Sequence, residues 1–248
     1  GLMLRAIKFD LFYTLTDSFR SAFILWLSGS KRRYGYATQM RSFLLTRSKI
    51  IPSEIMHRSK KYLGLLDVDS NTMIYPRLCF TDSEKSWAKE ELSKMGFKNP
   101  VAILPYSVEK NRTLPNELLR RWIKESEDEY LVFGSKKDLS LGNSLIDSCE
   151  DISIKSICGF YTLRESMVLL SLCNFTIATD SGLGHISAAL GIPTISFFGV
   201  GNKEITAPLG KKTYVLRYCN ACGEKKCFVS HTLSPYQTQN FYLSFENT

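Results

Sequence analysis

Apolar runs alternate regularly with helical stretches from about residue 100 onward. Six short runs rich in apolar and β-branched residues predict strands, at 100–106, 129–134, 151–157, 175–180, 193–199 and 213–218. Four stretches between them predict helices, at 116–126, 139–149, 162–173 and 184–191. Strands that are apolar throughout and are separated by helices are typical of a parallel sheet covered on both faces. The pattern therefore predicts an α/β domain with a doubly wound parallel sheet.

Short turns that suit a ligand follow several of these predicted strands. They are Tyr106-Ser107, Gly134-Ser135, Asp180-Ser181-Gly182 and Gly199. In a parallel α/β sheet, the ligand crevice lies beyond the carboxyl ends of the strands. We therefore expect one crevice assembled from these four strand ends.

The first hundred residues are less regular. The expected elements there are a strand at 5–17 and helices at 18–29, 54–66 and 83–96. The last of these helices ends at Gly96 and is a candidate linker. We expect an N-terminal domain over 1–82, the linker helix over 83–96 and a C-terminal α/β domain over 97–248.

The chain has 248 residues and a net charge of +8, and the excess is confined to its first quarter. Residues 1–61 contain twelve Lys and Arg against three acidic residues, which gives +9, whereas the rest contains twenty basic and twenty-one acidic residues. Basic residues cluster at Lys31-Arg32-Arg33 and Lys60-Lys61. Such a run is either a solvated face or a surface for an anionic partner: a phosphorylated substrate, a nucleic acid or lipid headgroups.

Composition narrows the class of protein. A hydrophobic content of 44% and a charged content of 23% are those of a globular protein with a sizeable core. No apolar run approaches the length of a membrane span, and the pattern of a signal peptide does not open the chain. Seven cysteines, an odd number without a secretory context, predict reduced thiols in the cytosol.

The segment 176–199 concentrates candidate binding chemistry. Ser181 and Gly182 stand where a helix begins, and a helix N-terminus offers unpaired backbone N–H groups to an anion. Asp180 suits the hydroxyls of a ribose or another sugar. Simple helix capping by Asp180 and Ser181, and a structural role for His185, are the alternatives. The same stretch also reads as Gly-x-Gly-x-x-Ser, an incomplete dinucleotide fingerprint with Glu204 about twenty residues later, which suggests an NAD-dependent oxidoreductase.

Several motifs in order resemble those of the bacterial lipopolysaccharide heptosyltransferases, glycosyltransferase family nine. The first motif is Asp180-Ser181-Gly182 with His185, the Ala-Ala-Leu-Gly run at 188–191 and Phe198-Gly199. The others are residues 105–115 from Pro105-Tyr106-Ser107 to Arg112-Thr113-Leu114-Pro115, Phe133-Gly134-Ser135 with Asp138, and residues 8–36. Together they cover almost the whole chain.

The resemblance implies the GT-B architecture, two Rossmann-like domains with parallel sheets, of which the C-terminal one holds the donor. It implies transfer of heptose from ADP-L-glycero-D-manno-heptose to the inner core of lipopolysaccharide, with inversion and with no metal or other cofactor. The implied partners are the nucleotide-sugar donor, a phosphorylated lipid A-core acceptor and an anionic membrane surface, and no nucleic acid. The implied location is cytoplasmic, peripheral at the inner face of the inner membrane.

Carried over by position, the resemblance assigns a donor site: Ser107, Val108, Arg112, Gly134, Asp138, Asp180, Ser181, Gly182 and His185. Arg112, where the family usually has lysine, would act as a catalytic cation on the leaving pyrophosphate, as a metal does elsewhere. The family's presumed general base lies on a Gly-Asp-rich loop, and nothing before Arg5 resembles that loop. We therefore expect an incomplete N-terminal domain, with Asp17 as the acid that would substitute as catalytic base.

A second motif lies near the C-terminus. Its members, Cys219, Cys222, Cys227 and His231, have the spacing of a compact zinc knuckle. The relatives often carry a cysteine-rich stretch there that is not part of the chemistry. The motif is therefore a secondary metal candidate, dispensable for donor binding, and we expect no metal in the reaction.

Three classes of function remain open from the sequence. They are an active glycosyltransferase, a nucleotide-sugar-binding homologue with impaired catalysis, and an NAD-dependent Rossmann oxidoreductase. Calorimetry with ADP-heptose, ADP and NAD separates the third class from the others. Turnover with an acceptor separates the first two.

Overall fold

The computed structural model describes residues 2–68, 74–149, 153–199 and 201–217. The chain forms two compact units. Unit 1 comprises Gly1–Ile74 with Glu204–Thr206, and unit 2 comprises Tyr75–Lys203 with Ala207–Thr248. The helix predicted at 83–96 forms as α4 (Asp82–Lys94). Its buried Ala88 and Leu92 belong to the core of unit 2, so this helix is part of that unit and not a linker.

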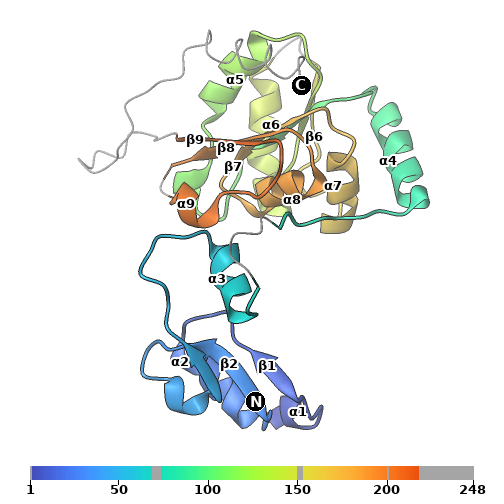
Figure 1. Cartoon of the computed structure of the whole chain (residues 1–248). Helices are drawn as coiled ribbons and strands as arrows, with labels where there is room; N and C mark the ends of the chain where they lie inside the picture. Colours follow the sequence, from blue (N-terminus) through green and yellow to red (C-terminus); the bar gives the residue numbers. More distant parts are fainter. Residues whose placement is uncertain (1, 69–73, 150–152, 200, 218–248) are drawn as a thin grey trace. The chain divides into compact units, whose positions relative to one another are not determined.

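Among the described residues, unit 2 contains a six-stranded sheet in which every pair of neighbours is parallel (Figure 1). Its strands are β4 (Val101–Leu104), β5 (Tyr130–Val132), β6 (Ile154–Ser156), β7 (Thr176–Thr179), β8 (Thr194–Phe198) and β9 (Thr213–Arg217). Every strand predicted from the apolar runs is therefore present. Their order across the sheet is β6-β5-β4-β7-β8-β9, the order 3-2-1-4-5-6 that is typical of a dinucleotide-binding fold.

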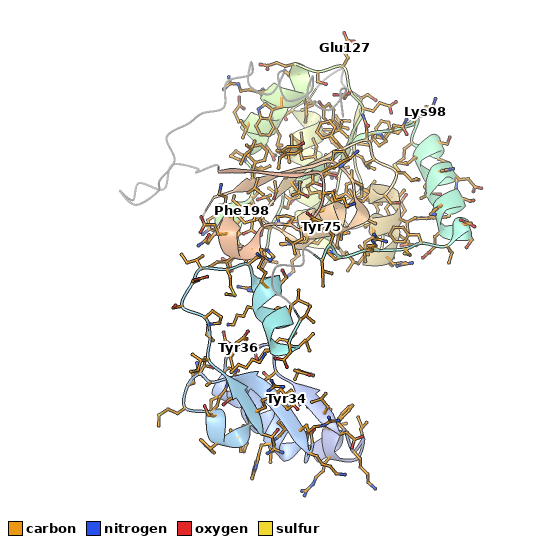
Figure 2. The ribbon with its side chains drawn as sticks, in the orientation of Figure 1. Tyr34, Tyr36, Tyr75, Lys98, Glu127 and Phe198 are labelled. Atoms are coloured by element: carbon orange, nitrogen blue, oxygen red, sulfur yellow. The ribbon has the colours of Figure 1, made fainter. Side chains whose placement is uncertain are left out.

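Helices cover both faces of this sheet, as predicted. They are α5 (Asn116–Lys124), α6 (Leu139–Asp147), α7 (Leu163–Leu170) and α8 (Gly182–Leu190). The short helix α9 (Lys203–Thr206) follows β8, and its residues Glu204–Thr206 belong to unit 1. Alternate residues of β4 divide between two hydrophobic clusters: Ala102 and Leu104 pack with α4, α7 and α8, whereas Val101 and Ile103 pack with α5 and α6. Figure 2 shows side chains filling the space on both sides of the sheet, with Phe198 completely buried at the end of β8.

Capping boxes start both helices that pack together on one face. Thr162 and Glu165 form the predicted box at the start of α7, and Thr81 and Glu84 form another at the start of α4. Arg164 of α7 donates to Glu84 across the two helices, with Nε and Oε1 2.7 Å apart. The box and the ion pair thus share one carboxylate.

Acid should lower the stability of unit 2 by protonating Glu84. The hydrogen bond from Arg164, and then the one from the Thr81 backbone N–H, lower the pKa of Glu84 to about 2 from 4.5. A carboxylate with a lowered pKa stabilises the fold above its unfolded pKa, and that contribution is lost as the pH falls from about 4.5 to about 2. We expect Glu84→Gln to melt below the wild type at pH 7, and the difference to vanish near pH 2. Thermal melts at several pH values test this. Glu90→Gln, an exposed change on the same helix, should leave a much smaller difference, and a constant gap for Glu84→Gln would contradict the assignment.

Unit 1 is smaller and contains a three-stranded parallel sheet among the described residues. Its elements are α1 (Leu2–Arg5), β1 (Leu11–Tyr13), α2 (Phe19–Leu27), β2 (Arg32–Tyr36), η1 (Ser42–Leu44), β3 (Arg47–Lys49) and α3 (Arg58–Leu65). The strands are ordered β1-β2-β3, and Ala22 and Leu25 of α2 pack on Leu44 and Leu45. Helices α2 and α3 lie within the predicted ranges 18–29 and 54–66.

The strand predicted at 5–17 was too long, and two strands were not predicted. Lys8 adopts φ +55, which interrupts an extended run, so that only Leu11–Tyr13 is a strand. Strands β2 and β3 consist mostly of charged and polar residues, with the sequences RRYGY and RSK. Such runs lack the apolar alternation of a strand, and they are strands here because β2 pairs with β1 and β3 pairs with β2.

Candidate functional site

The order of the strands predicts where a ligand would bind to unit 2. Connections from β4 lead through β5 to β6 in one direction, and the chain then returns to β7 on the other side of β4. The direction therefore reverses between β4 and β7, and ligands of open α/β sheets bind outside the carboxyl ends of the strands at such a point. Arg112 follows β4 and Asp180 follows β7. The structure thus brings two residues that are distant in sequence to the predicted crevice.

Arg112 and Asp180 form an ion pair there. The guanidinium Nη1 lies 3.2 Å from the Asp180 carboxylate oxygen Oδ2. The side chain of Asp180 is 6% exposed and that of Arg112 is 37% exposed, so the carboxylate is buried while part of the guanidinium faces solvent. Thr179 Oγ1 also donates to the backbone carbonyl of Arg112, which fixes the loop after β4 against the end of β7. The pair therefore presents a held cation at the mouth of the crevice.

The N-terminus of α8 stands beside this pair in sequence. Ser181 is its N-cap residue, but its side chain makes no capping bond, and the buried hydroxyl has no hydrogen-bond partner among the described residues. The position of a Cβ on Gly182 has no atom within 4 Å. His185 lies one turn further into the helix and is half-buried. Simple capping by Ser181 is therefore excluded, and the backbone N–H groups of the first turn are not shielded by a side chain at Gly182.

The turn after β5 is built around Asp138. Its carboxylate accepts from the Ser135 backbone N–H at 2.8 Å and from the Ser135 hydroxyl at 2.6 Å, as in a capping box. Gly134 leaves room for its neighbours, because a Cβ there would lie 2.7 Å from Cys158 Sγ and 3.0 Å from Tyr106 Cδ2. Asp138 therefore holds the turn after β5 in place. A ligand could use only the acceptor positions of its carboxylate that Ser135 does not occupy.

Residues of the β4 loop complete the crevice. The Ser107 backbone N–H donates to Thr113 Oγ1 at 3.4 Å, and the side chain of Val108 is fully exposed. Tyr106 was not predicted as a site residue: its ring is buried, and its hydroxyl has no partner among the described residues. Burial raises the pKa of Tyr106 and also that of Cys158, so both stay protonated at neutral pH. The sequence placed Tyr106 in a turn that suits a ligand, and the structure adds that its hydroxyl is buried there.

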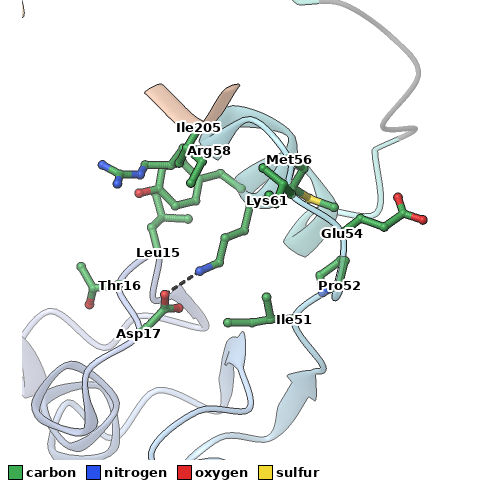
Figure 3. A pocket seen from close by; sticks show the side chains of 12 residues that line it. Leu15, Thr16, Asp17, Ile51, Pro52, Glu54, Met56, Arg58, Lys61 and Ile205 are labelled. Carbon is green, nitrogen blue, oxygen red and sulfur yellow. Dashed lines mark hydrogen bonds and ion pairs between the residues drawn. The ribbon is translucent and has the colours of Figure 1, made fainter. Parts of the chain in front are cut away.

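Asp17 lies in unit 1, in a pocket of about 320 Å³ (Figure 3). Leu15, Ile51 and Met56 contribute apolar walls, and Asp17 and Lys61 face each other within it. The Lys61 ammonium donates to Asp17 Oδ2 at 2.5 Å. The Lys61 ammonium occupies one carboxylate oxygen of Asp17, so in this arrangement Asp17 serves first to fix Lys61.

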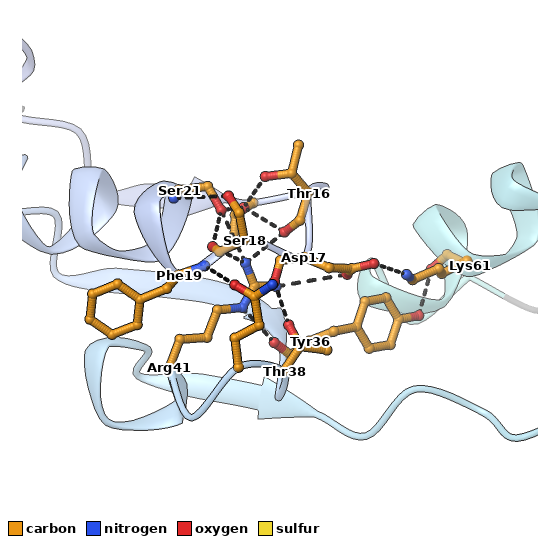
Figure 4. Close-up of polar contacts among 11 residues, drawn as sticks. Thr16, Asp17, Ser18, Phe19, Ser21, Tyr36, Thr38, Arg41 and Lys61 are labelled. Atoms are coloured by element: carbon orange, nitrogen blue, oxygen red, sulfur yellow. Dashed lines mark hydrogen bonds and ion pairs between the residues drawn. The ribbon is translucent and has the colours of Figure 1, made fainter.

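A second cation supports the same loop (Figure 4). The Arg41 side chain is completely buried and donates to the backbone carbonyls of Thr16, Ser18 and Tyr36 at 2.6–3.0 Å. Its Nη2 lies 3.9 Å from Asp17 Oδ1. Burial lowers the pKa of Arg41, and the charge of Asp17 opposes that effect. Arg41 was not singled out from the sequence, because nothing local distinguishes it from the other arginines of the basic quarter.

The basic clusters of unit 1 are only partly available to a partner. Arg33 donates to the carbonyl of Leu44 at 2.8 Å and to that of Ser30 at 2.5 Å, and Lys61 is held by Asp17. Lys31 and Arg32 are exposed. The +9 balance of the first quarter therefore overstates the charge that a partner meets.

The described part of the chain contains neither a group of metal ligands nor a membrane-spanning helix. Cys79, Cys149, Cys158 and Cys173 are free thiols there. No cluster of three or more potential metal ligands occurs in this part, and Cys219, Cys222, Cys227 and His231 lie outside it. None of its helices has the length and hydropathy needed to span a membrane.

The doubly wound parallel sheet of unit 2 and the parallel sheet of unit 1 give an α/β fold that matches structures of the GT-B class. The family model for glycosyltransferase family 9 (heptosyltransferase) matches residues 2–235. The chain belongs to this family of transferase enzymes, as its motifs predicted.

Individual relatives agree. The chain is 26% identical over 235 residues to lipopolysaccharide heptosyltransferase 2 of Escherichia coli. The aligned residues make up 88% of this chain and 67% of that protein. The solved structure of E. coli ADP-heptose LPS heptosyltransferase II has a TM-score of 0.79 at 23% identity, over 99% of this chain and 80% of that one. An E. coli heptosyltransferase solved with ADP has a TM-score of 0.71 at 16% identity, over 98% and 74% of the two chains.

Proposed function

We propose that unit 2 binds the nucleotide of ADP-heptose and that the protein transfers the heptose to the inner core of lipopolysaccharide, with inversion and without a metal or other cofactor. One observation carries the proposal: the Arg112–Asp180 pair stands at the switch point of the sheet, next to a helix N-terminus without a side-chain cap. A fixed cation and free backbone N–H groups are what a diphosphate requires. Two structurally similar heptosyltransferases, one named for ADP-heptose and one solved with ADP, support the choice of nucleotide.

In this proposal the residues of the crevice divide the donor between them. Arg112 and the first turn of α8 neutralise the negative charge that develops on the departing ADP, which is the electrostatic task that a metal ion performs elsewhere. Asp180 holds the Arg112 guanidinium in place and accepts a hydroxyl of the sugar. Ser107 and Val108 lie beside the phosphates, and Asp138 meets the adenosine end, after the turn at Gly134. Ser181, Gly182 and His185 hold the phosphates and the heptose. No metal enters these steps.

The acceptor side belongs to unit 1. Transfer requires a base to take the proton of the acceptor hydroxyl. Asp17 meets this requirement only if the acceptor displaces Lys61, because the two groups are 2.5 Å apart. Exposed basic residues of unit 1 suit the phosphates of a lipid A-core acceptor. The protein then works in the cytoplasm, peripherally at the anionic inner face of the inner membrane, and needs no nucleic acid.

The oxidoreductase alternative loses support from the position of its fingerprint. In dinucleotide-binding folds the Gly-rich turn follows the first strand of the sheet, whereas Gly182 and Gly184 follow β7, the fourth strand. Gly184 is explained by packing, since a Cβ there would lie 3.1 Å from the Thr179 carbonyl and 3.2 Å from Ala178 Cβ. Calorimetry with ADP, ADP-heptose and NAD tests the choice, and binding of NAD in preference to ADP would overturn the proposed function. A catalytically impaired homologue would bind ADP-heptose and release no ADP with acceptor.

Obstructing the N-terminus of α8 should weaken nucleotide binding. A valine side chain at Gly182 enters open space, so Gly182→Val should fold normally while it obstructs the approach of a phosphate to the backbone. We expect ADP to bind at least about tenfold more weakly in calorimetry, the loss of roughly one charge-assisted hydrogen bond. Ala189→Val, on the same helix but away from its N-terminus, is the matched control. ADP affinity unchanged by Gly182→Val would place the phosphates elsewhere.

A further inference from the structure

Helix α2 of unit 1 carries a row of aromatic side chains on its outer face. Phe19, Phe23 and Trp26 are 41%, 41% and 49% exposed, whereas Ala22 and Leu25 are buried. The spacing of four and three residues places the rings on one side of the helix. Ring centroids lie 6.4 Å apart between Phe19 and Phe23, and 5.8 Å apart between Phe23 and Trp26. The helix is thus apolar on its inner side and aromatic on its outer side.

A neighbouring element extends this row. Phe43 in η1 is 74% exposed, and its ring centroid lies 6.3 Å from that of Phe19. The Phe19 backbone N–H donates to Gln39 Oε1 at 2.7 Å, which ties the loop before η1 to the start of α2. Figure 4 shows the Phe19 ring pointing away from the polar contacts around Arg41. Phe19, Phe23, Trp26 and Phe43 together are called the aromatic face below.

Exposed basic residues flank the aromatic face. Arg20 is exposed on α2, and the helix contains no acidic residue. Arg5 lies at the other end of the helix, with its Cγ and Nε 3.5 Å from the position of a Cβ on Gly29. Lys31 and Arg32 follow and are exposed. Aromatic rings with a basic rim are complementary to an anionic lipid interface, where phenylalanine and tryptophan enter the headgroup region and arginine meets phosphate.

We propose that the aromatic face docks on an anionic lipid bilayer, with α2 lying in the plane of the interface. The inference rests on the proposed function in one respect only: a lipid-linked acceptor gives the protein a reason to meet a membrane. A contiguous exposed aromatic surface on a globular protein marks an interaction site. The basic residues around it favour an anionic bilayer rather than an uncharged apolar partner. An amphipathic helix with basic flanks binds such a surface without spanning it.

The fluorescence of Trp26 reports docking directly. Trp87 packs against Tyr161 and Trp122 stacks on Phe197, so that Trp87→Phe with Trp122→Phe leaves Trp26 as the single emitter. The probe is a vesicle of phosphatidylcholine and phosphatidylglycerol that contains no lipopolysaccharide. We expect a blue shift of Trp26 emission and protection from acrylamide with these vesicles, and neither change with phosphatidylcholine alone. Absence of both changes would overturn the proposal, and ADP calorimetry on the same sample shows whether the donor site is intact.

Substitutions separate the aromatic contribution from charge. Phe23→Ser with Phe43→Ser should weaken vesicle binding in co-sedimentation by at least about tenfold, since both rings leave the interface. The matched control is Phe160→Ser, an aromatic side chain of unit 2 that is 69% exposed. Arg20→Glu should also weaken binding, and more so at low salt. Vesicle binding that the phenylalanine variants leave unchanged would overturn the proposal. A concentration-dependent dimer that these variants abolish would instead assign the face to a second copy of the chain.

Discussion

Arg112→Ala is expected to weaken ADP binding by about ten- to a hundredfold. A charge-assisted hydrogen bond contributes about 1.5–3 kcal/mol, and Arg112 is the side chain that the structure holds at the switch point with its guanidinium partly exposed. Removing it also leaves the carboxylate of Asp180 buried and unpaired, which repels a diphosphate. Transfer should fall further, by about 10²–10³-fold, because the cation acts mainly on charge that develops in the transition state. Calorimetry with ADP and release of ADP from ADP-heptose measure the two effects.

Two further variants make this result specific. Arg112→Lys keeps the charge but cannot form the same fork with Asp180, so it should fall between the wild type and Arg112→Ala. Arg121→Ala removes an exposed arginine of α5 in the same unit and should bind ADP as the wild type does. If Arg112→Ala bound ADP normally while Gly182→Val did not, the α8 N-terminus alone would be the phosphate site.

Arg41→Met is expected to cost unit 1 about 3–5 kcal/mol, the range for breaking a buried charged network by removing one partner. Three backbone carbonyls and the Ser21 hydroxyl would each lose the hydrogen bond from a completely buried guanidinium and keep only one other donor among the described residues. The cost falls on a unit whose hydrophobic cluster is small, so we expect unit 1 to lose its fold while unit 2 keeps its own. Hydrogen exchange read by mass spectrometry should show loss of protection in α2 and β2 and none in β4 and β7.

The matched control is Arg20→Met, which removes an exposed arginine from the same unit. It should leave the exchange of α2 unchanged. Donor binding by calorimetry should survive Arg41→Met, because the crevice residues all belong to unit 2. Protection of α2 that is undiminished in Arg41→Met would show that the three carbonyls find water or another donor at little cost.

Family membership and the fold of unit 2 were both predictable from sequence. The motifs around Asp180 and Arg112 indicated glycosyltransferase family 9, which the match over residues 2–235 confirms. The apolar runs gave all six strands, because strands buried on both faces must be apolar throughout. The Thr162–Glu165 capping box was also predictable from sequence, because its two hydrogen bonds join residues only three apart.

Other features depend on partners that are far away in the chain. The Arg112–Asp180 pair joins residues whose meeting requires the strand order β4-β7, which periodicity does not specify. Strands β2 and β3 have the composition of a charged loop, and backbone pairing of β2 with β1 and of β3 with β2 makes them strands. The helix at 83–96 was correctly placed in sequence, but its packing on α7 assigns it to unit 2.

The sequence by itself determined the α/β class, the sheet strands of unit 2, the family and the set of residues that follow the strand ends. It did so because apolar periodicity and capping are properties of short segments. The tertiary structure decided which of those residues meet and what each charge does. It pairs Arg112 with Asp180 and Asp17 with Lys61. It also buries Arg41 and leaves three aromatic rings of α2 exposed. Each of these outcomes depends on which side of an element faces a core, and that is fixed only when distant segments pack together.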